Sequence, residues 1–215
     1  MPISKLASNN FSTLTLQNLT DTFKIIEVNT LVFPSVEIQR NSEIIQEIVL
    51  DSKDEIDSWT EQELVIKQIS VILKNANLKG ENYNTFAGRP IGANVEGFEL
   101  TGFVDFLIAG GRYEPTKPYF FIHEFKKSIN HSGDPFAQLI GELIVSQVIN
   151  ESGKQSVYGL VVIGRLWYFI VLNEKYFTRM QPLNSTDPDE LFEIFCHLAG
   201  VKHYIEEQIL IAKKD

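Results

Sequence analysis

The sequence lacks the features that tie a protein to a membrane or to an oxidising compartment. Cys196 is the only cysteine among the 215 residues, so no internal disulfide can form. The longest uninterrupted apolar stretch, residues 166–172, is far shorter than the roughly 18 or more residues of a transmembrane helix. The opening MPISKLASNN has no apolar segment of the kind found in signal peptides. We therefore predict a cytoplasmic protein with no membrane partner.

Several common catalytic patterns are also missing. No histidine lies at ligand spacing from a second histidine or from the cysteine, which argues against a zinc site. Gly110-Gly111 is followed by Arg112 and not by the Lys-Ser or Lys-Thr of a phosphate-binding loop. The strand-turn-helix motif around a nucleophilic serine is absent. No internal repeat is present, which excludes solenoids and propellers.

Lys and Arg are fewer than Asp and Glu in this sequence. The chain has 19 Lys and Arg against 28 Asp and Glu, a net charge of −9, which argues against a surface coated in positive charge but leaves room for a local basic groove. The apolar content of 44% is ordinary for a folded protein, and the length fits one large domain. We predict that residues 58–215 form this domain and that residues 1–57 form an N-terminal extension.

Local signals mark three main helices. Thr60 with Glu63, or Ser58 with Glu61, forms a capping box at the start of a helix over residues 59–76. Asp134-Pro135 is a helix start with Asp at the N-cap and Pro at the first position. A third helix is expected from Asp187-Pro188 onward, and a short one over residues 14–23.

Strands are expected at residues 101–109, 119–126, 157–163 and 167–172, with a hairpin turn at Gly164-Arg165 and a further short strand at residues 30–33. The order of helices and strands predicts an α/β protein with a mixed central sheet of about four or five strands flanked by helices.

The first two of these strands carry acidic side chains where strands usually carry apolar ones. Asp105 lies in the middle of its strand, and Glu124 and Lys126 share one face of the next strand because side chains alternate with a period of two. If the two strands pair, Asp105 and Glu124 can converge beside Lys126. Two carboxylates with a backbone carbonyl suit Mg²⁺ (or Mn²⁺), which lowers the pKa of a bound water and neutralises charge on a phosphate.

This stretch resembles the PD-(D/E)XK superfamily of nucleases. The matching residues are Gly102-Phe103-Val104-Asp105, Glu124-Phe125-Lys126 and Gln138 in the helix that follows. The resemblance covers roughly residues 58–173, and Val104 replaces the proline in the name of the motif.

The resemblance implies a restriction-endonuclease-like fold and a Mg²⁺-dependent phosphodiesterase, an endo- or exonuclease, with DNA as the expected substrate. Asp105, Glu124 and the Phe125 backbone carbonyl would bind the metal, with Glu63 or Glu61 as a further acid. Lys126 would position the attacking water, Gln138 would support the site, and the product would carry a 5′-phosphate.

Each of these residues also has a purely structural interpretation. Asp105 could cap a turn or pair with Arg112, Glu124 and Lys126 could alternate along an exposed edge strand, and Gln138 could be solvated. Glu61 and Glu63 could serve the helix start alone. His123 points away from the Glu124 face and is expected to pack, and Cys196 is expected to be a core thiol.

Two alternative functions follow from the sequence. One is a catalytically silent nuclease-fold protein that binds nucleic acid or a protein partner, which the acidic segment 51–63 favours. The other is an assembly protein that forms a homodimer through the aromatic strand at residues 167–169. A basic rim around the site could come from the five cationic residues Arg89, Arg112, Lys117, Lys127 and Arg165.

Overall fold

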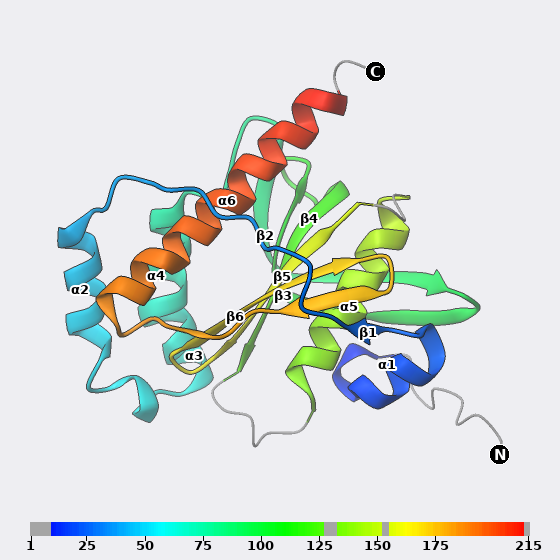
Figure 1. The fold of residues 1–215 in the computed structure, drawn as a ribbon, viewed down its shortest axis with the longest axis horizontal. Helices are drawn as coiled ribbons and strands as arrows, with labels where there is room; N and C mark the ends of the chain where they lie inside the picture. The colour runs from blue at the N-terminus through cyan, green and yellow to red at the C-terminus, as the bar shows by residue number, and fades with distance from the viewer. Residues whose placement is uncertain (1–9, 127–132, 152–154, 213–215) are drawn as a thin grey trace.

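A mixed β-sheet with helices on both faces forms the centre of the protein (Figure 1). The computed structural model describes residues 10–126, 133–151 and 155–212. Eight strands are present in this part of the chain, in the order β1-β7-β6-β5-β4-β3-β2, with β8 paired to β6. The predicted α/β class and mixed sheet are therefore confirmed, and the sheet has more strands than expected.

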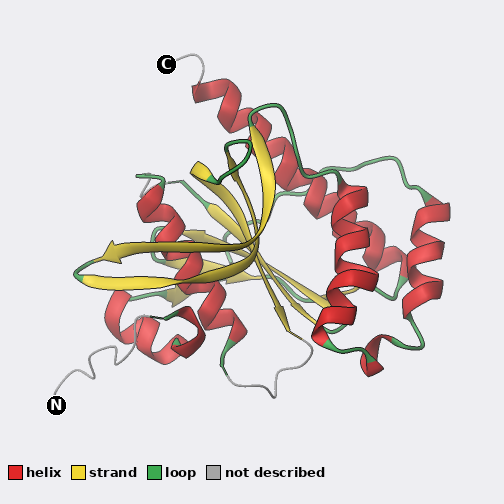
Figure 2. Ribbon diagram, turned by 180° about the vertical axis from the view of Figure 1, so that it is seen from behind, coloured by secondary structure: helices red, strands yellow, loops and turns green. Residues whose placement is uncertain are grey.

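The strands are β1 (Ile26–Glu27), β2 (Tyr83–Val95), β3 (Phe98–Gly110), β4 (Thr116–Lys126), β5 (Val157–Ile163), β6 (Leu166–Asn173), β7 (Tyr176–Arg179) and β8 (Leu183–Asn184). The β4–β5 and β1–β7 pairs are parallel, and the other named pairs are antiparallel. β2 and β3 form a long hairpin whose tip extends beyond the helices (Figure 2).

The helices are α1 (Leu16–Phe23), α2 (Ser42–Ser52), α3 (Glu61–Leu64), α4 (Ser70–Ala76), α5 (Pro135–Ile149) and α6 (Pro188–Ala212). A π-helical turn, η3 (Val65–Ile69), joins α3 to α4, and the short 3₁₀ turns η1 (Phe11–Thr13) and η2 (Ile56–Ser58) complete the set.

The predicted helix starts are confirmed by their capping bonds. The Thr60 hydroxyl accepts a hydrogen bond from the Glu63 backbone, and the Glu63 carboxylate accepts one from the Thr60 backbone. Asp134 caps α5 by accepting from the backbone N–H groups of Phe136 and Ala137. These bonds satisfy donors that the first turn of a helix leaves free.

The predicted strand at residues 30–33 is wrong. This segment has no regular structure, and β1 lies just before it at Ile26–Glu27. Val32 is 84% exposed while Phe33 is buried, and the Leu31 backbone donates a hydrogen bond to Thr178 Oγ1, so the segment is held by separate contacts and not by a ladder.

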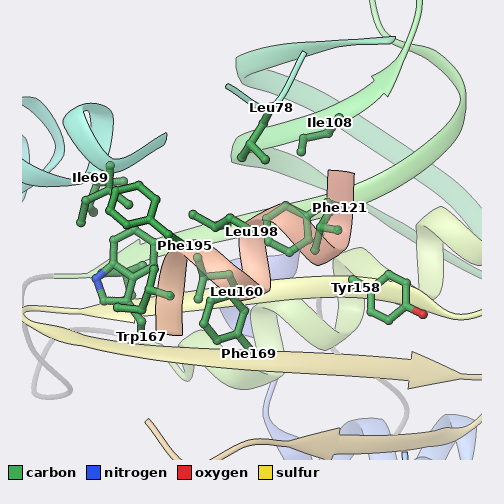
Figure 3. Close-up of a cluster of buried hydrophobic side chains, with 14 of the residues drawn as sticks. Ile69, Leu78, Ile108, Phe121, Tyr158, Leu160, Trp167, Phe169, Phe195 and Leu198 are labelled. Carbon is green, nitrogen blue, oxygen red and sulfur yellow. The ribbon is translucent and has the colours of Figure 1, made fainter. Parts of the chain in front are cut away.

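Two apolar clusters lie on opposite faces of the sheet because neighbouring strand residues point in opposite directions. On one face, α4 and α6 cover Leu160, Phe169 and Trp167 (Figure 3). On the other face, α5 and α1 cover Val161 and Ile170. Residues 10–57 contribute to both clusters, with Phe11, Leu14, Leu19, Phe23 and Ile25 on the α5 side and Phe33, Ile45, Ile48 and Ile56 on the α6 side. No helix in the described ranges is long and apolar enough to cross a membrane.

Candidate functional site

β3 and β4 separate at the position where Asp105 and Glu124 face each other in the register. Phe106 pairs with His123, but the ladder has no further pair beyond this point. Asp105 Oδ2 instead accepts a hydrogen bond of 2.9 Å from the backbone N–H of Phe125. The Asp105 carboxylate therefore takes the place of a β3 backbone carbonyl as the acceptor for the Phe125 N–H, at the point where the two strands separate.

The ladder on the other side of β3 is interrupted at the same residue. Ala87 pairs with Phe106 and Arg89 with Val104, so Gly88, with a φ of +59°, stands opposite Asp105 without pairing. Only glycine adopts such a φ without steric cost, which lets β2 bend away here. The alternative pairing of Asp105 with Arg112 is not observed, because Arg112 lies over the Tyr113 ring.

Glu124 is fully buried between the sheet and α5. Its Oε1 lies 2.7 Å from Lys126 Nζ, and its Oε2 accepts a 2.7 Å hydrogen bond from Gln138 Nε2. Burial and the negative charge of Asp105 raise the pKa of Glu124 to about 7, although Lys126 acts in the opposite direction. The alternative of an exposed edge strand is wrong, because β4 lies between β3 and β5 and Glu124 has no exposed surface.

Lys126 is the accessible member of the group, with 26% of its side chain exposed. Burial by itself would lower the pKa of Lys126, but the carboxylates of Glu124, Glu61 and Asp105 outweigh it and raise the pKa. The ammonium group therefore stays charged at neutral pH. Such a group can donate hydrogen bonds to a water or to a phosphate oxygen.

A second buried acid, Glu142, belongs to the same network. Gln138 Nε2 also donates to Glu142 Oε1 at 3.2 Å, one helical turn further along α5. Glu142 is fully buried, and its Oε2 has no hydrogen-bond partner among the described residues. Burial and the nearby charge of Glu124 raise the pKa of Glu142 well above its usual value. Glu142 is not among the site residues predicted from the sequence; the signal that marks it is that it is the only charged residue in α5.

The two acids at the start of α3 have different surroundings. Glu63 binds the Thr60 backbone and lies 3.2 Å from Lys67 Nζ, and these bonds lower its pKa. Glu61 is the acid whose charge reaches the site, because it contributes to the raised pKa of both Glu124 and Lys126. Of the two candidates, the electrostatics therefore favour Glu61 near the site, and the hydrogen bonds of Glu63 place it at the helix start.

The cations expected to rim the site are held elsewhere. Arg89 pairs with Glu114, Lys117 with Glu151, and Arg165 with Asp57. Arg112 lies over Tyr113, and Lys127 is outside the described residues. The predicted rim is thus divided into separate ion pairs.

The remaining sequence expectations concern packing. His123 is buried among Phe106, Phe121 and Phe125 on the face opposite Glu124, and burial lowers its pKa well below the usual value. Cys196 is a buried free thiol, as predicted.

The aromatic strand lies inside the sheet. Trp167 and Phe169 are fully buried, and β6 has strand partners on both sides, β5 on one and β7 with β8 on the other. Neither ring is therefore accessible to a second copy of the chain in this structure, and the homodimer stays a prediction.

The oxygen atoms at the strand split suit a hard divalent cation. Asp105 and Glu124 supply carboxylates, and the N–H and C=O of one strand residue point to the same edge, so the Phe125 carbonyl faces the same split as its N–H. In the described ranges, no three His, Cys, Asp or Glu side chains are arranged as a metal site. An ion would therefore be bound by two carboxylates, the backbone carbonyl and water, which is a coordination typical of Mg²⁺.

Comparisons with known proteins give no further guide. A scan against protein-family models found no match, and no curated protein matches the sequence.

Proposed function

We propose that this protein is a Mg²⁺- or Mn²⁺-dependent nuclease of the restriction-endonuclease-like fold that hydrolyses phosphodiester bonds, with DNA as the expected substrate. The observation that carries the proposal is the convergence of Asp105, Glu124 and Lys126 at the split between β3 and β4. Three groups separated by up to 21 positions in the chain meet there, which an unrelated set of surface charges would not do.

Each residue has a defined task in this proposal. Asp105, Glu124 and the Phe125 carbonyl would hold the ion, and Gln138 orients the Glu124 carboxylate through its 2.7 Å bond. A bound divalent ion supplies a water of lowered pKa and neutralises charge that grows on the phosphate. Lys126 donates hydrogen bonds to the attacking water or to a non-bridging oxygen, and its positive charge stabilises the developing negative charge.

One observation favours the catalytically silent alternative. The Lys126 ammonium lies 2.7 Å from Glu124 Oε1, an oxygen that a metal ligand would have to share. In a protein that never binds an ion, this pair would simply neutralise a buried carboxylate.

A metal titration monitored by thermal melting distinguishes the two functions. We expect the melting temperature of the wild type to rise with Mg²⁺ or Mn²⁺, because a ligand that binds only the folded state stabilises it by mass action. Asp105→Ala should abolish the rise, whereas Asp54→Ala, which removes an exposed acid on the loop after α2, should keep it.

Cleavage of supercoiled plasmid and of a single-stranded oligonucleotide completes the test. A wild-type protein that cuts neither substrate and shows no metal-linked shift would refute the nuclease and leave the silent alternative.

A further inference from the structure

A groove lies between the η3–α4 segment and the sheet, and Asp105 is part of its lining. Its volume is about 640 Å³. The helical segment η3–α4 supplies Val65, Ile69 and Leu73 to one wall, and β3 supplies Phe106. Twelve residues of this segment, 65–76, extend over roughly 18 Å at the usual helical rise.

The charge of the groove differs from that of the whole protein. Lys74 and Lys79 line it and are exposed, and neither has a carboxylate partner among the residues that the structure describes. Asp105 is the only acid in the lining. A protein with a net charge of −9 thus presents two free ammonium groups next to the candidate site, as a polyanion would require.

Phe106 gives the groove a flat apolar surface. It is half-buried, and its ring is held edge-to-face against His123 with the ring centroids 5.1 Å apart. A fixed aromatic ring in a positively charged groove is the usual arrangement for stacking an unpaired base.

The helix beside the groove is irregular at the same place. The π-helical turn η3 carries Val65 and Ile69 of the lining, and π-turns are rare and frequent at functional sites. Val65 and Ile69 of this turn line the groove together with Asp105.

We propose that this groove binds one strand of nucleic acid, with a base stacked on Phe106 and the phosphates near Lys74 and Lys79, so that a phosphodiester reaches Asp105. Phe106 and Asp105 both line the groove, so a base stacked on Phe106 would lie near the carboxylate that is expected to bind the metal. The inference rests on the proposed function and restricts its substrate to unpaired strands. A base in an intact duplex is paired and stacked, so it cannot stack on Phe106. The substrate class is therefore single-stranded nucleic acid or an unpaired strand end.

Fluorescence anisotropy in EDTA tests binding without cleavage. The probes are a labelled single-stranded DNA oligonucleotide, an RNA of the same sequence, and the DNA duplex. We expect the wild type to bind the single strands at least about tenfold more tightly than the duplex. Lys74→Ala combined with Lys79→Ala should weaken single-strand binding by roughly tenfold and reduce the salt dependence, because two phosphate contacts are lost.

Two further variants separate the roles of charge and stacking. Lys53→Ala combined with Lys175→Ala removes the same charge from exposed positions outside the groove and should leave binding nearly unchanged. Phe106→Leu keeps the apolar packing and removes the ring face, so it should weaken binding by roughly tenfold at an unchanged salt dependence.

The outcomes also separate this inference from the nuclease itself. Metal-dependent cleavage by a protein whose groove variants bind like the control would keep the nuclease and refute the groove. Groove-dependent binding without a metal-linked melting shift or cleavage would keep the groove and refute the nuclease. Equal affinity for duplex and single strand, or concentration-dependent dimerisation that Phe106→Leu abolishes, would overturn the single-strand assignment.

Discussion

The two long helices, α5 and α6, cover opposite faces of one sheet and bury different side chains. α6 faces the sheet with Leu191, Ile194 and Leu198, all fully buried. α5 buries a comparable apolar set but also Glu142, a carboxylic acid with one unpartnered oxygen. An apolar residue at that position would be less costly to bury. The comparison indicates that Leu191, Ile194 and Leu198 of α6 contribute to stability, whereas the burial of Glu142 in α5 costs stability and maintains the polar network around Glu124.

The largest expected effect is on the chemistry of the candidate site. Asp105→Asn retains a side-chain oxygen that can accept from the Phe125 N–H but removes the negative charge. We expect cleavage to fall at least about 1000-fold, or about 4 kcal/mol of barrier. The melting temperature should stay equal or rise, because the repulsion that raises the pKa of Glu124 is removed. Unfolding of this variant would instead show that Asp105 has a structural role.

The second prediction concerns the α6 face. Leu198→Ala leaves a cavity in the cluster of Figure 3 and should lower the free energy of unfolding by about 2–5 kcal/mol in a urea titration. The Mg²⁺-linked melting shift should be unchanged, because Leu198 lies in the apolar cluster and supplies no ligand to the candidate site. Leu143→Ala, a matched change in α5, should cost a similar amount and also reduce cleavage. If Leu198→Ala and Leu143→Ala reduced cleavage equally, the proposed difference between α6 and α5 would be contradicted.

The third prediction is a variant that should stabilise the protein, in contrast to the two leucine substitutions. Glu142→Gln keeps an oxygen that accepts from Gln138 and removes a buried carboxyl, so the protein should gain about 1–3 kcal/mol at neutral pH. The pKa of Glu142 is raised on folding, so the wild type loses stability as the pH rises above 4.5, whereas glutamine does not titrate. The gain should therefore be small at low pH and grow toward neutral pH.

Glu47→Gln, an exposed change in α2, is the control and should leave the stability nearly unchanged. A loss of stability in Glu142→Gln would mean that the ionised carboxylate is itself stabilising.

The smallest expected effect separates the two acids of α3. Glu63→Gln weakens the capping box and should lower stability slightly without changing the Mg²⁺-linked melting shift. Glu61→Gln should leave stability within about 0.5 kcal/mol and reduce the metal-linked shift. The reverse result would assign the supporting role to Glu63.

The elements that the sequence predicted correctly depend on local chemistry. Asp134-Pro135 and Thr60 with Glu63 start helices through bonds within one turn, and strand alternation was sufficient to place Glu124 and Lys126 on one face. Convergence with Asp105 required only that two neighbouring strands pair.

The parts that were not predicted depend on distant partners. β2 contains Gly88 and Gly92, which are poor strand formers, and it is held as a strand by its ladder to β3. Helical periodicity does not show that Glu142 is buried against Glu124, because that contact joins α5 to β4. The sequence does not show that Lys74 and Lys79 line one groove with Asp105, because that placement depends on the packing of α4 against the sheet.

The hydrogen bond between Asp105 and the Phe125 amide gives the protein an internal reporter. Any species that draws electron density from that carboxylate must weaken the bond and shift the resonance of one backbone proton. The ¹⁵N–¹H signal of Phe125 would thus record occupancy of the site directly, even in a variant that turns nothing over.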